Sequence, residues 1–352
     1  MASITECSGM ITKKPSGKES DLDRRSEQLF ENHRDFILNE ATAFYETTPD
    51  RLNRLGSFES IVYEFEKDRR RYILKITHSL HRSLELIQGE LEWVRYLAEG
   101  GVGVSPVVLS KNGQLVERVD VDDSYFLVYV FEKASGRLPS SDNWGAGLFE
   151  KWGQTLGRMH RRTKTFVPSH SACRRFHWHE DYTMELEKFI PASQPLVLEK
   201  GKLLRQRLHN LPCDRDAYGL VHCDLHHGNF FVDDGRLTVF DFDDCQYHWF
   251  AFDIAIPLFY VLRDARVNPD DMAFASGFMT AFMTGYNQEN HLDREWMERL
   301  PLFLKLRELE LYCLLLDMEP GQMNDWCRRL LDHRRERIER EIPVIDMDFT
   351  NF

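Results

Sequence analysis

The 352-residue sequence has no apolar segment long enough to suggest a membrane span. Its most apolar long run, residues 249–262, is shorter than the ~20 residues that a helix needs to cross a bilayer, and it contains Asp253. Residues 1–26 are polar and charged, without the apolar core of a secretory signal. The sequence therefore predicts neither a membrane protein nor a secreted one.

Paired cysteines and an excess of positive charge are also lacking. The seven cysteines are odd in number and far apart, with no Cys-x-x-Cys pair, which indicates free thiols in a reducing compartment. The 45 Lys and Arg residues are outnumbered by 57 Asp and Glu residues, which gives a net charge of −12. Neither half of the chain has the basic excess typical of a nucleic-acid-binding protein. We therefore expect a cytoplasmic protein with no nucleic-acid partner and no membrane association.

What the sequence does contain is a group of polar residues around a predicted hairpin. Two apolar runs flank Asp233-Asp234-Gly235, which is a hairpin turn signal. Folding at this turn sets Asn229 roughly opposite Phe240, so that Asn229 and Asp241 emerge side by side. Their oxygens suit Mg²⁺, and Asp224, on the loop that enters the hairpin, can orient a substrate hydroxyl. The pattern predicts a phosphoryl-transfer centre with Asp224 as catalytic residue and with Asn229 and Asp241 as metal ligands.

The spacing His-x-Asp-x-x-x-x-Asn, followed by a strand that ends in Asp, resembles the catalytic loop and metal-binding Asp of the protein-kinase-like fold. The matching residues are His222, Asp224, Asn229 and Asp241. Asp253-Ile254-Ala255 begins only 12 residues after Asp241, which leaves no room for the activation segment of a protein kinase. A short link of this kind is similar to the aminoglycoside phosphotransferase and choline kinase-like family.

This resemblance covers residues 218–256 strongly and residues 51–136 moderately. It implies a bilobal α+β fold, with a small antiparallel-sheet N-lobe and a mainly helical C-lobe. It also implies ATP and Mg²⁺ as cofactors and a small-molecule acceptor. The expected parts of the chain are a disordered tail at 1–28, the nucleotide-binding N-lobe at 29–131, a hinge at 132–136 and the C-lobe at 137–352.

The expected N-lobe contains a strand, a Gly-containing loop, a second strand, a turn and a third strand with one Lys. With the catalytic loop present, the backbone of Gly56, Ser57 and Phe58 is the natural cover for the ATP phosphates. Lys75 is the one charge in an apolar strand, so it needs anionic partners. The resemblance implies that Lys75 contacts the α- and β-phosphates and pairs with a Glu of the next helix. Glu90 is the first choice for that Glu, and Glu92 is the second.

The resemblance also locates the adenine pocket and part of the acceptor pocket. Adenine would face the backbone from Glu132 to Ala134, with Phe131 at the back of the pocket. An insertion before the catalytic loop helps to shape the acceptor site in this family. Its aromatic residues Trp178 and Tyr182 would face a cationic acceptor.

The acceptor is expected to be small and cationic. Without an activation segment, a compact pocket beside the catalytic loop is more natural than a platform for a peptide. Asp243 and Asp244 directly follow the metal-binding Asp241, and a shielded carboxylate there is available to an ammonium group. The alternative is that both serve only the structure of the loop.

Other interpretations of the same residues remain open. Residues 238–244 also resemble the first motif of haloacid-dehalogenase phosphatases, although the chain after Asp241 has a helical pattern. A metal site built from His222, Asp224, His226 and His227 lacks the spacing that would place three ligands on one helix face. Our main prediction is an ATP- and Mg²⁺-dependent kinase of a hydroxyl, with an amine as the second choice, on a metabolite or antibiotic. The alternatives are a stress-response-type bacterial Ser/Thr protein kinase and a nucleotide-binding pseudokinase or interaction protein.

Overall fold

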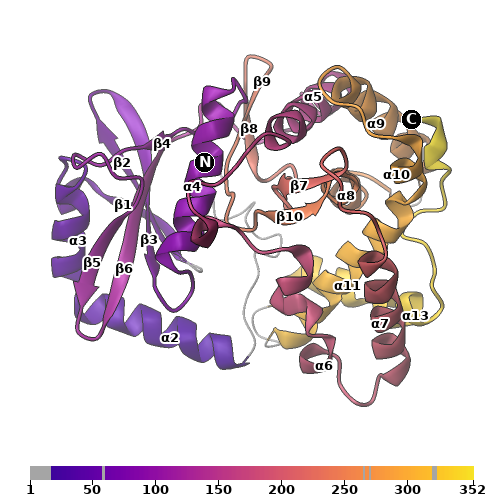
Figure 1. Ribbon diagram of the computed structural model, residues 1–352, viewed down its shortest axis with the longest axis horizontal. Helices are drawn as coiled ribbons and strands as arrows, with labels where there is room; N and C mark the ends of the chain where they lie inside the picture. Colours follow the sequence, from indigo (N-terminus) through magenta and orange to yellow (C-terminus); the bar gives the residue numbers. More distant parts are fainter. Residues whose placement is uncertain (1–16, 58–59, 265, 269–270, 319–322) are drawn as a thin grey trace. The chain divides into compact units, whose positions relative to one another are not determined.

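The computed structural model describes residues 17–57, 60–264, 266–268, 271–318 and 323–352 (Figure 1). Contacts within the chain divide it into two compact units. The first unit consists of Met1–Ala134 and Val167–Arg174. The second consists of Ser135–Phe166 and Arg175–Phe352.

The first unit is built on an antiparallel sheet with the strand order β1-β2-β3-β6-β4. The strand β5 pairs with residues 124–128, the N-terminal half of β6. The chain turns from β2 to β3 through Asp68 and Arg69, which both have positive φ angles, as a two-residue hairpin turn requires. Its strands are β1 (Asn53–Ser57), β2 (Ser60–Lys67), β3 (Arg70–His78), β4 (Val107–Val108), β5 (Glu117–Val121) and β6 (Ser124–Glu132).

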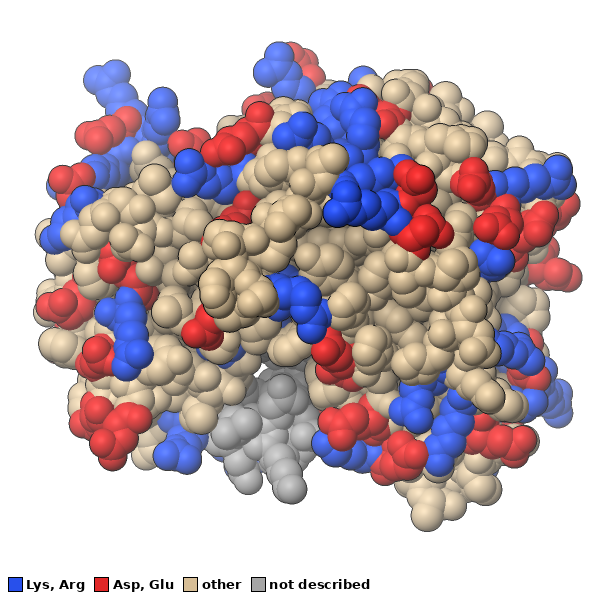
Figure 2. Space-filling view, in the orientation of Figure 1, with Lys and Arg blue, Asp and Glu red and all other residues tan. Residues whose placement is uncertain are grey.

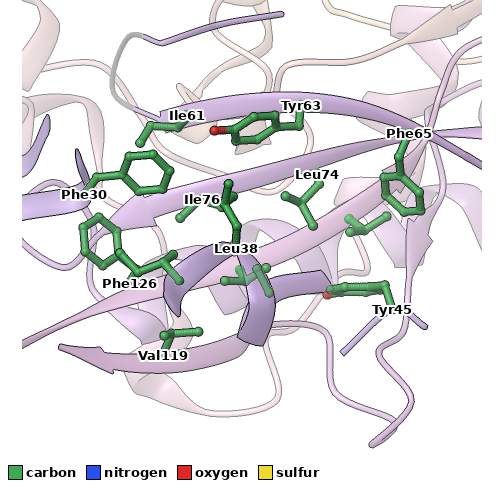
Figure 3. Close-up of a cluster of buried hydrophobic side chains, with 14 of the residues drawn as sticks. Phe30, Leu38, Tyr45, Ile61, Tyr63, Phe65, Leu74, Ile76, Val119 and Phe126 are labelled. Carbon is green, nitrogen blue, oxygen red and sulfur yellow. The ribbon is translucent and has the colours of Figure 1, made fainter. Parts of the chain in front are cut away.

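Two helices, α2 (Gly17–Asn32) and α3 (Arg34–Ala43), supply apolar side chains to a core on the sheet. Figure 3 shows Phe30 and Leu38 from these helices gathered with side chains from the strands. The expectation of a disordered tail over residues 1–28 is wrong from Gly17 onward. The fully buried ring of Phe30 gives α2 a tertiary anchor that the charged sequence before it does not reveal. Residues 1–16 lie outside the described residues.

Helix α4 (Leu84–Glu99) follows β3, and the Oγ of Ser83 caps its start by accepting from the Leu86 amide. Segment 167–174 packs closely on this helix at Gly89. A Cβ at this position would collide with the Cys173 carbonyl oxygen, so the close approach requires glycine. The same contact involves Glu92, whose carboxylate accepts from the amide of Ser169 (2.9 Å) and from its hydroxyl (2.5 Å).

The second unit is mainly helical. Its longer helices are α5 (Ala146–Thr163), α7 (Pro195–His209), α8 (Phe250–Val261), α9 (Met272–Asn287) and α11 (Leu300–Asp317). Its shorter helices are α6 (Leu186–Phe189), α10 (Arg294–Glu298), α12 (Asp325–Leu331) and α13 (Arg334–Glu339). Two short antiparallel pairs lie among them: β7 (Tyr218–Val221) with β10 (Gln246–Trp249), and β8 (Phe230–Asp233) with β9 (Arg236–Val239).

Helices α5 and α9 approach each other closely because glycines replace larger side chains where they meet. A Cβ at Gly153 would collide with the Phe282 carbonyl oxygen, and one at Gly285 would collide with the Glu150 carbonyl oxygen. This close approach brings His160 of α5 within hydrogen-bond distance of Tyr286 of α9.

Helix α8 is buried along its entire length, although it carries Asp253 in its first turn. After Asp241, the described chain forms the short strand β10 and then helices, not the α/β unit of a haloacid-dehalogenase phosphatase. The antiparallel sheet in the first unit and the helices of the second agree with the predicted α+β class. No helix in the described part of the chain combines the length and apolarity needed to cross a membrane.

Candidate active site

The predicted hairpin is formed by β8 and β9. Its turn residues Asp234 and Gly235 have φ angles of 47° and 73°, the left-handed backbone that Asp-Gly favours. Phe230 pairs with Val239, and the Phe240 amide then donates to the Asn229 carbonyl oxygen at 3.0 Å. The prediction that Asn229 lies opposite Phe240 is therefore confirmed.

The loop before this hairpin is anchored by Asp253. One carboxylate oxygen accepts from the Cys223 amide (2.8 Å), and the other accepts from the His222 amide (3.2 Å). These bonds hold Cys223 at a φ of 65°, which a non-glycine residue seldom adopts. Asp253 at the start of α8 therefore binds the backbone of the catalytic loop.

A chain of buried hydrogen bonds holds Asp253 in turn. The amide of Asn290 donates to the Tyr286 hydroxyl (2.8 Å), which lies 2.9 Å from Nδ1 of His160. Nε2 of His160 lies 3.0 Å from the Asp253 carboxylate. Burial lowers the pKa of His160 despite that carboxylate, so its ring is neutral and donates through Nε2. The packing of α5 on α9 thus determines the shape of the loop.

Asp224 lies within this loop and is buried. The Asn229 side-chain amide donates to the Asp224 carbonyl oxygen (2.9 Å) and to its Oδ2 (3.2 Å). Nδ1 of His222 accepts from the Asp224 amide (3.3 Å), while Nε2 of His222 lies 3.2 Å from the Phe240 carbonyl oxygen. The structure therefore brings Asp224 and Asn229 together, and His222 braces the loop against the hairpin.

Arg307 of α11 is a contact of Asp224 that the sequence analysis missed. Its Nη2 donates to Oδ1 of Asp224 at 2.5 Å and to the Tyr260 hydroxyl at 2.8 Å, and its Nη1 donates to Glu310 at 3.3 Å. A signal was present in the sequence, because Arg307, Glu308 and Glu310 stand among the leucines of a mainly apolar helix, and all three are buried. Buried charges require partners.

Asp241, Asp243 and Asp244 follow β9 and are partly buried. Asp241 has a φ of 67°, which lies in the left-handed region. The buried guanidinium of Arg175 donates to the carbonyl oxygens of Asp243 (2.5 Å) and Cys245 (2.8 Å), so it fixes the backbone of this segment. Arg175 is a second positioning group that the sequence analysis did not identify.

The donor atoms of this segment fit a divalent cation. The Asn229 side chain donates to Asp224 through Nδ2, and these two bonds fix the orientation of the amide and therefore the direction of its Oδ1. Asp241 supplies a carboxylate, and it directly follows Phe240, whose amide is bound to the Asn229 carbonyl oxygen. Two oxygen ligands, completed by phosphate oxygens and water, are the usual protein contribution to a Mg²⁺ site.

The alternative histidine metal site finds no support in the side-chain geometry. Nε2 of His227 lies 3.0 Å from Asp264, and Nδ1 of His226 accepts from the Gly228 amide (2.9 Å). Nε2 of His226 lies 3.4 Å from Asp224. Over the residues that the structure describes, no three His, Cys, Asp or Glu side chains converge as metal ligands would.

The residues predicted to bind nucleotide lie in the first unit. Lys75 occupies β3 between Val62 of β2 and Tyr129 of β6, and it is partly buried. Gly56 lies in β1, beside an irregularity in its pairing with β2, and a Cβ there would meet no atom within 4 Å. Ser57 ends β1, and Phe58 falls outside the described residues.

Glu90 and Glu92 occupy different environments on α4. Glu90 is 2% exposed, whereas Glu92 is bound to Ser169 and to the side-chain amide of Gln88 (3.0 Å). In the predicted hinge, the Glu132 amide donates to Pro106 and the Lys133 amide donates to Arg71. Phe131, in β6, and Ala134 are both buried.

Trp178 does not have the exposure expected of an acceptor-binding residue. Its ring is 4% exposed and packs against Trp249 (ring centroids 5.3 Å apart) and His209 (4.9 Å). The sequence could not separate this packing role from a binding role, because a tryptophan in such an insertion is suited to either one. Tyr182 is partly buried and lies beside Phe189.

Comparison with known proteins identifies the family. Residues 52–296 match the phosphotransferase enzyme family. The chain is 41% identical over 321 residues to the amicoumacin kinase of Bacillus subtilis (strain 168), covering 90% of this chain and 96% of that protein. The solved structure of amicoumacin kinase hAmiN in complex with AMP-PNP, Ca²⁺ and Ami matches with a TM-score of 0.88 at 37% identity, over 93% of this chain and 99% of that one. A microcompartment-associated aminopropanol kinase has the same fold (TM-score 0.68, 23% identity, 87% and 98% of the two chains).

These matches confirm the predicted resemblance and fold class, and a nucleotide analogue is bound in the structure of the amicoumacin kinase. The chain belongs to the phosphotransferase enzyme family, and it is a kinase that transfers a phosphoryl group to an alcohol of a small molecule.

Proposed function

We propose that this protein uses ATP and Mg²⁺ to phosphorylate a hydroxyl group of an amicoumacin-type antibiotic. The observation that carries the proposal is the end-to-end similarity to amicoumacin kinases, at 41% identity over 90% of the chain and with a TM-score of 0.88 to the complex that contains Ami. Similarity confined to the catalytic loop would support only a shared reaction. Similarity that also includes the helices after the loop supports a shared type of acceptor.

In the proposed reaction, Asp224 orients the acceptor hydroxyl and receives its proton late in a loose transition state. Its carboxylate is held by Asn229 and Arg307, and its backbone is held by Asp253 through the neighbouring amides. Asn229 and Asp241 would hold the metal. When bound, Mg²⁺ neutralises charge on the β- and γ-phosphates.

The nucleotide-binding roles proposed from the sequence are retained. Lys75 would contact the α- and β-phosphates and pair with Glu90, because Glu92 is already bound to Ser169. The backbone of residues 56–58 would cover the phosphates. Adenine would be recognised by the backbone of residues 132–134, where the Glu132 and Lys133 amides already bind the carbonyl oxygens of Pro106 and Arg71.

We propose that the acceptor binds near Asp243 and Asp244, with Tyr182 contributing an aromatic face, and we no longer include the buried Trp178. We also propose a cytoplasmic location, since the six cysteines that the structure describes are all free thiols. A nucleic-acid partner is not proposed. Figure 2 shows Lys and Arg side chains interspersed with Asp and Glu over the visible face.

The proposed function is tested by incubating the full chain with MgATP and amicoumacin. Formation of ADP together with a phosphorylated antibiotic, detected by mass spectrometry, is the expected result. Spectinomycin, aminopropanol, choline and a generic protein substrate serve as competing acceptors. Efficient phosphorylation of one of these, with amicoumacin left unchanged, would show that the acceptor is wrong although the enzyme class is right.

Replacing Lys75 by Ala is expected to weaken ATP binding by about 10- to 100-fold, the equivalent of a lost charge-assisted contact of roughly 1.5–3 kcal/mol. The fold should be retained, because the neighbours of Lys75 in β3 are apolar. Calorimetric titration with ATP measures the loss. Glu90→Gln should show a weaker form of the same defect, and Glu92→Gln should not.

Lys67→Ala is the matched control for Lys75. Lys67 lies at the end of β2, and its Nζ is 2.7 Å from Glu46 and 3.2 Å from the Tyr45 carbonyl oxygen. Normal ATP affinity in the Lys75 variant, with a loss in the Lys67 variant, would transfer the phosphate-binding role to Lys67.

A further inference from the structure

Arg307 places a positive charge in the interior, directly against the proposed catalytic carboxylate. The residue is 5% exposed, and the buried charged residues that share α11 with it are Glu308 and Glu310. Its guanidinium donates to Asp224 of the catalytic loop, to Tyr260 of α8 and to Glu310 of α11 itself. A cation at this depth is retained only when such partners compensate its loss of hydration.

The guanidinium is firmly in its charged form. Burial alone would lower the pKa of Arg307, but Tyr260, Asp224 and Glu310 together raise it well above the ordinary value. The ring of Tyr260, which supports the guanidinium through its hydroxyl, also packs against His226 (ring centroids 4.6 Å apart). Tyr260 and Glu310 therefore hold the Arg307 guanidinium in place independently of its contact with Asp224.

The Asp224 carboxylate is held from two sides. Arg307 of α11 binds Oδ1, while Oδ2 lies 3.2 Å from Nδ2 of Asn229 and 3.4 Å from Nε2 of His226, both on the catalytic loop. The loop bonds alone would leave the carboxylate free to rotate about its bond to Cβ. A second contact on the other oxygen determines the plane of the group, and therefore the direction of its remaining lone pairs.

We propose that Arg307 is a positioning residue for phosphoryl transfer, which fixes the Asp224 carboxylate in the orientation that aligns the acceptor hydroxyl with the γ-phosphate. The inference rests on the proposed function only in taking Asp224 as the residue that orients the acceptor. Arginine suits this role better than lysine because its planar group serves Asp224 and Glu310 through separate nitrogens.

The role predicts a specific kinetic signature. Misalignment of Asp224 should lower kcat by about 100-fold in Arg307→Ala, since an error of this kind acts on the reacting geometry. The KM for ATP should stay at the wild-type value, because the hydrogen-bond partners of Arg307 are Asp224, Tyr260 and Glu310, and none of these three is proposed to bind nucleotide. Arg307→Lys should recover part of kcat, since it keeps the charge but loses the forked geometry.

Chemical rescue separates positioning from a general structural effect. Added guanidinium ion should enter the space left in Arg307→Ala and restore kcat in a saturable manner. Urea, which has a similar shape but no charge, should not restore it. Arg334→Ala is the matched control, because Arg334 is also a buried arginine paired with a carboxylate, but its ion-pair partner is Glu308 of α11 and not Asp224. Guanidinium should not raise the activity of this control.

Rates are measured with amicoumacin and, in parallel, as slow transfer from ATP to water. Failure of wild-type enzyme to phosphorylate amicoumacin would count against the proposed acceptor, while the water reaction still tests Arg307. The positioning role would be overturned by a folded Arg307→Ala variant with wild-type kcat, or by one that guanidinium does not rescue. Should that variant fail to fold, wild-type kcat in Arg307→Lys would overturn it, and a reduced kcat with unchanged ATP KM would support it.

Discussion

Replacing Asp224 by Asn is expected to reduce phosphoryl transfer by about 10²–10⁴-fold, the range associated with loss of a positioned general base. Asn keeps the size of the side chain and an oxygen that can accept from Arg307, but it cannot take the proton of the acceptor hydroxyl. Nucleotide binding should be retained, because the carboxylate is proposed to act on the acceptor. Steady-state turnover and calorimetric titration of ATP with Mg²⁺ measure the two effects separately.

The fold of the Asp224→Asn variant should survive because Arg307 keeps Glu310 as a charged partner at 3.3 Å. Asp234→Asn is the control: it makes the same chemical change at the exposed turn of the following hairpin, where Asn also tolerates the positive φ of 47°. Turnover close to wild type in the Asp224 variant, with the control equally active, would remove Asp224 from its proposed role.

The parts of the site that could be predicted from the sequence are those determined by short-range geometry. The Asp234-Gly235 turn and the strand period of two fix the register of β8 and β9, and that register sets Asn229 opposite Phe240. The spacing from His222 to Asn229 belongs to one short loop, so it can be compared directly with a known motif. In the first unit, β1, β2 and β3 are likewise consecutive antiparallel neighbours, whereas β6 pairs with β3 and β4 across crossovers that no local turn determines.

The parts that could not be predicted depend on packing between distant segments. Arg307 is 83 residues from Asp224 in the chain, and the two meet through the packing of elements far apart in the sequence, such as α11 on α8. The sequence does reveal that buried charges interrupt α11, but it does not say which partner each one finds. Trp178 shows the opposite error, because an aromatic residue in a polar insertion resembles a binding residue until its burial is known.

Replacing Asp241 by Ala is expected to abolish the increase in ATP affinity that Mg²⁺ produces, and with it detectable transfer. A carboxylate is the stronger of the two proposed protein ligands, and the neutral amide of Asn229 alone would bind a hydrated divalent cation weakly. Nucleotide binding without metal should persist, since the residues proposed to bind adenine and the α-phosphate belong to the first unit. Calorimetric titrations of ATP with and without Mg²⁺ on wild type and variant measure this difference.

The backbone at Asp241 makes the choice of control important. Its φ of 67° disfavours Ala, so Asp241→Ala carries a conformational cost as well as the loss of a ligand. Asp234→Ala makes the same substitution at another left-handed Asp, with a φ of 47°, at the opposite end of the same hairpin. Backbone strain would therefore lower the unfolding temperature of both variants, whereas only Asp241→Ala should lose the effect of Mg²⁺. An unchanged Mg²⁺ dependence in Asp241→Ala would contradict the metal-binding role, and a loss shared by both variants would attribute the defect to the hairpin and not to the carboxylate.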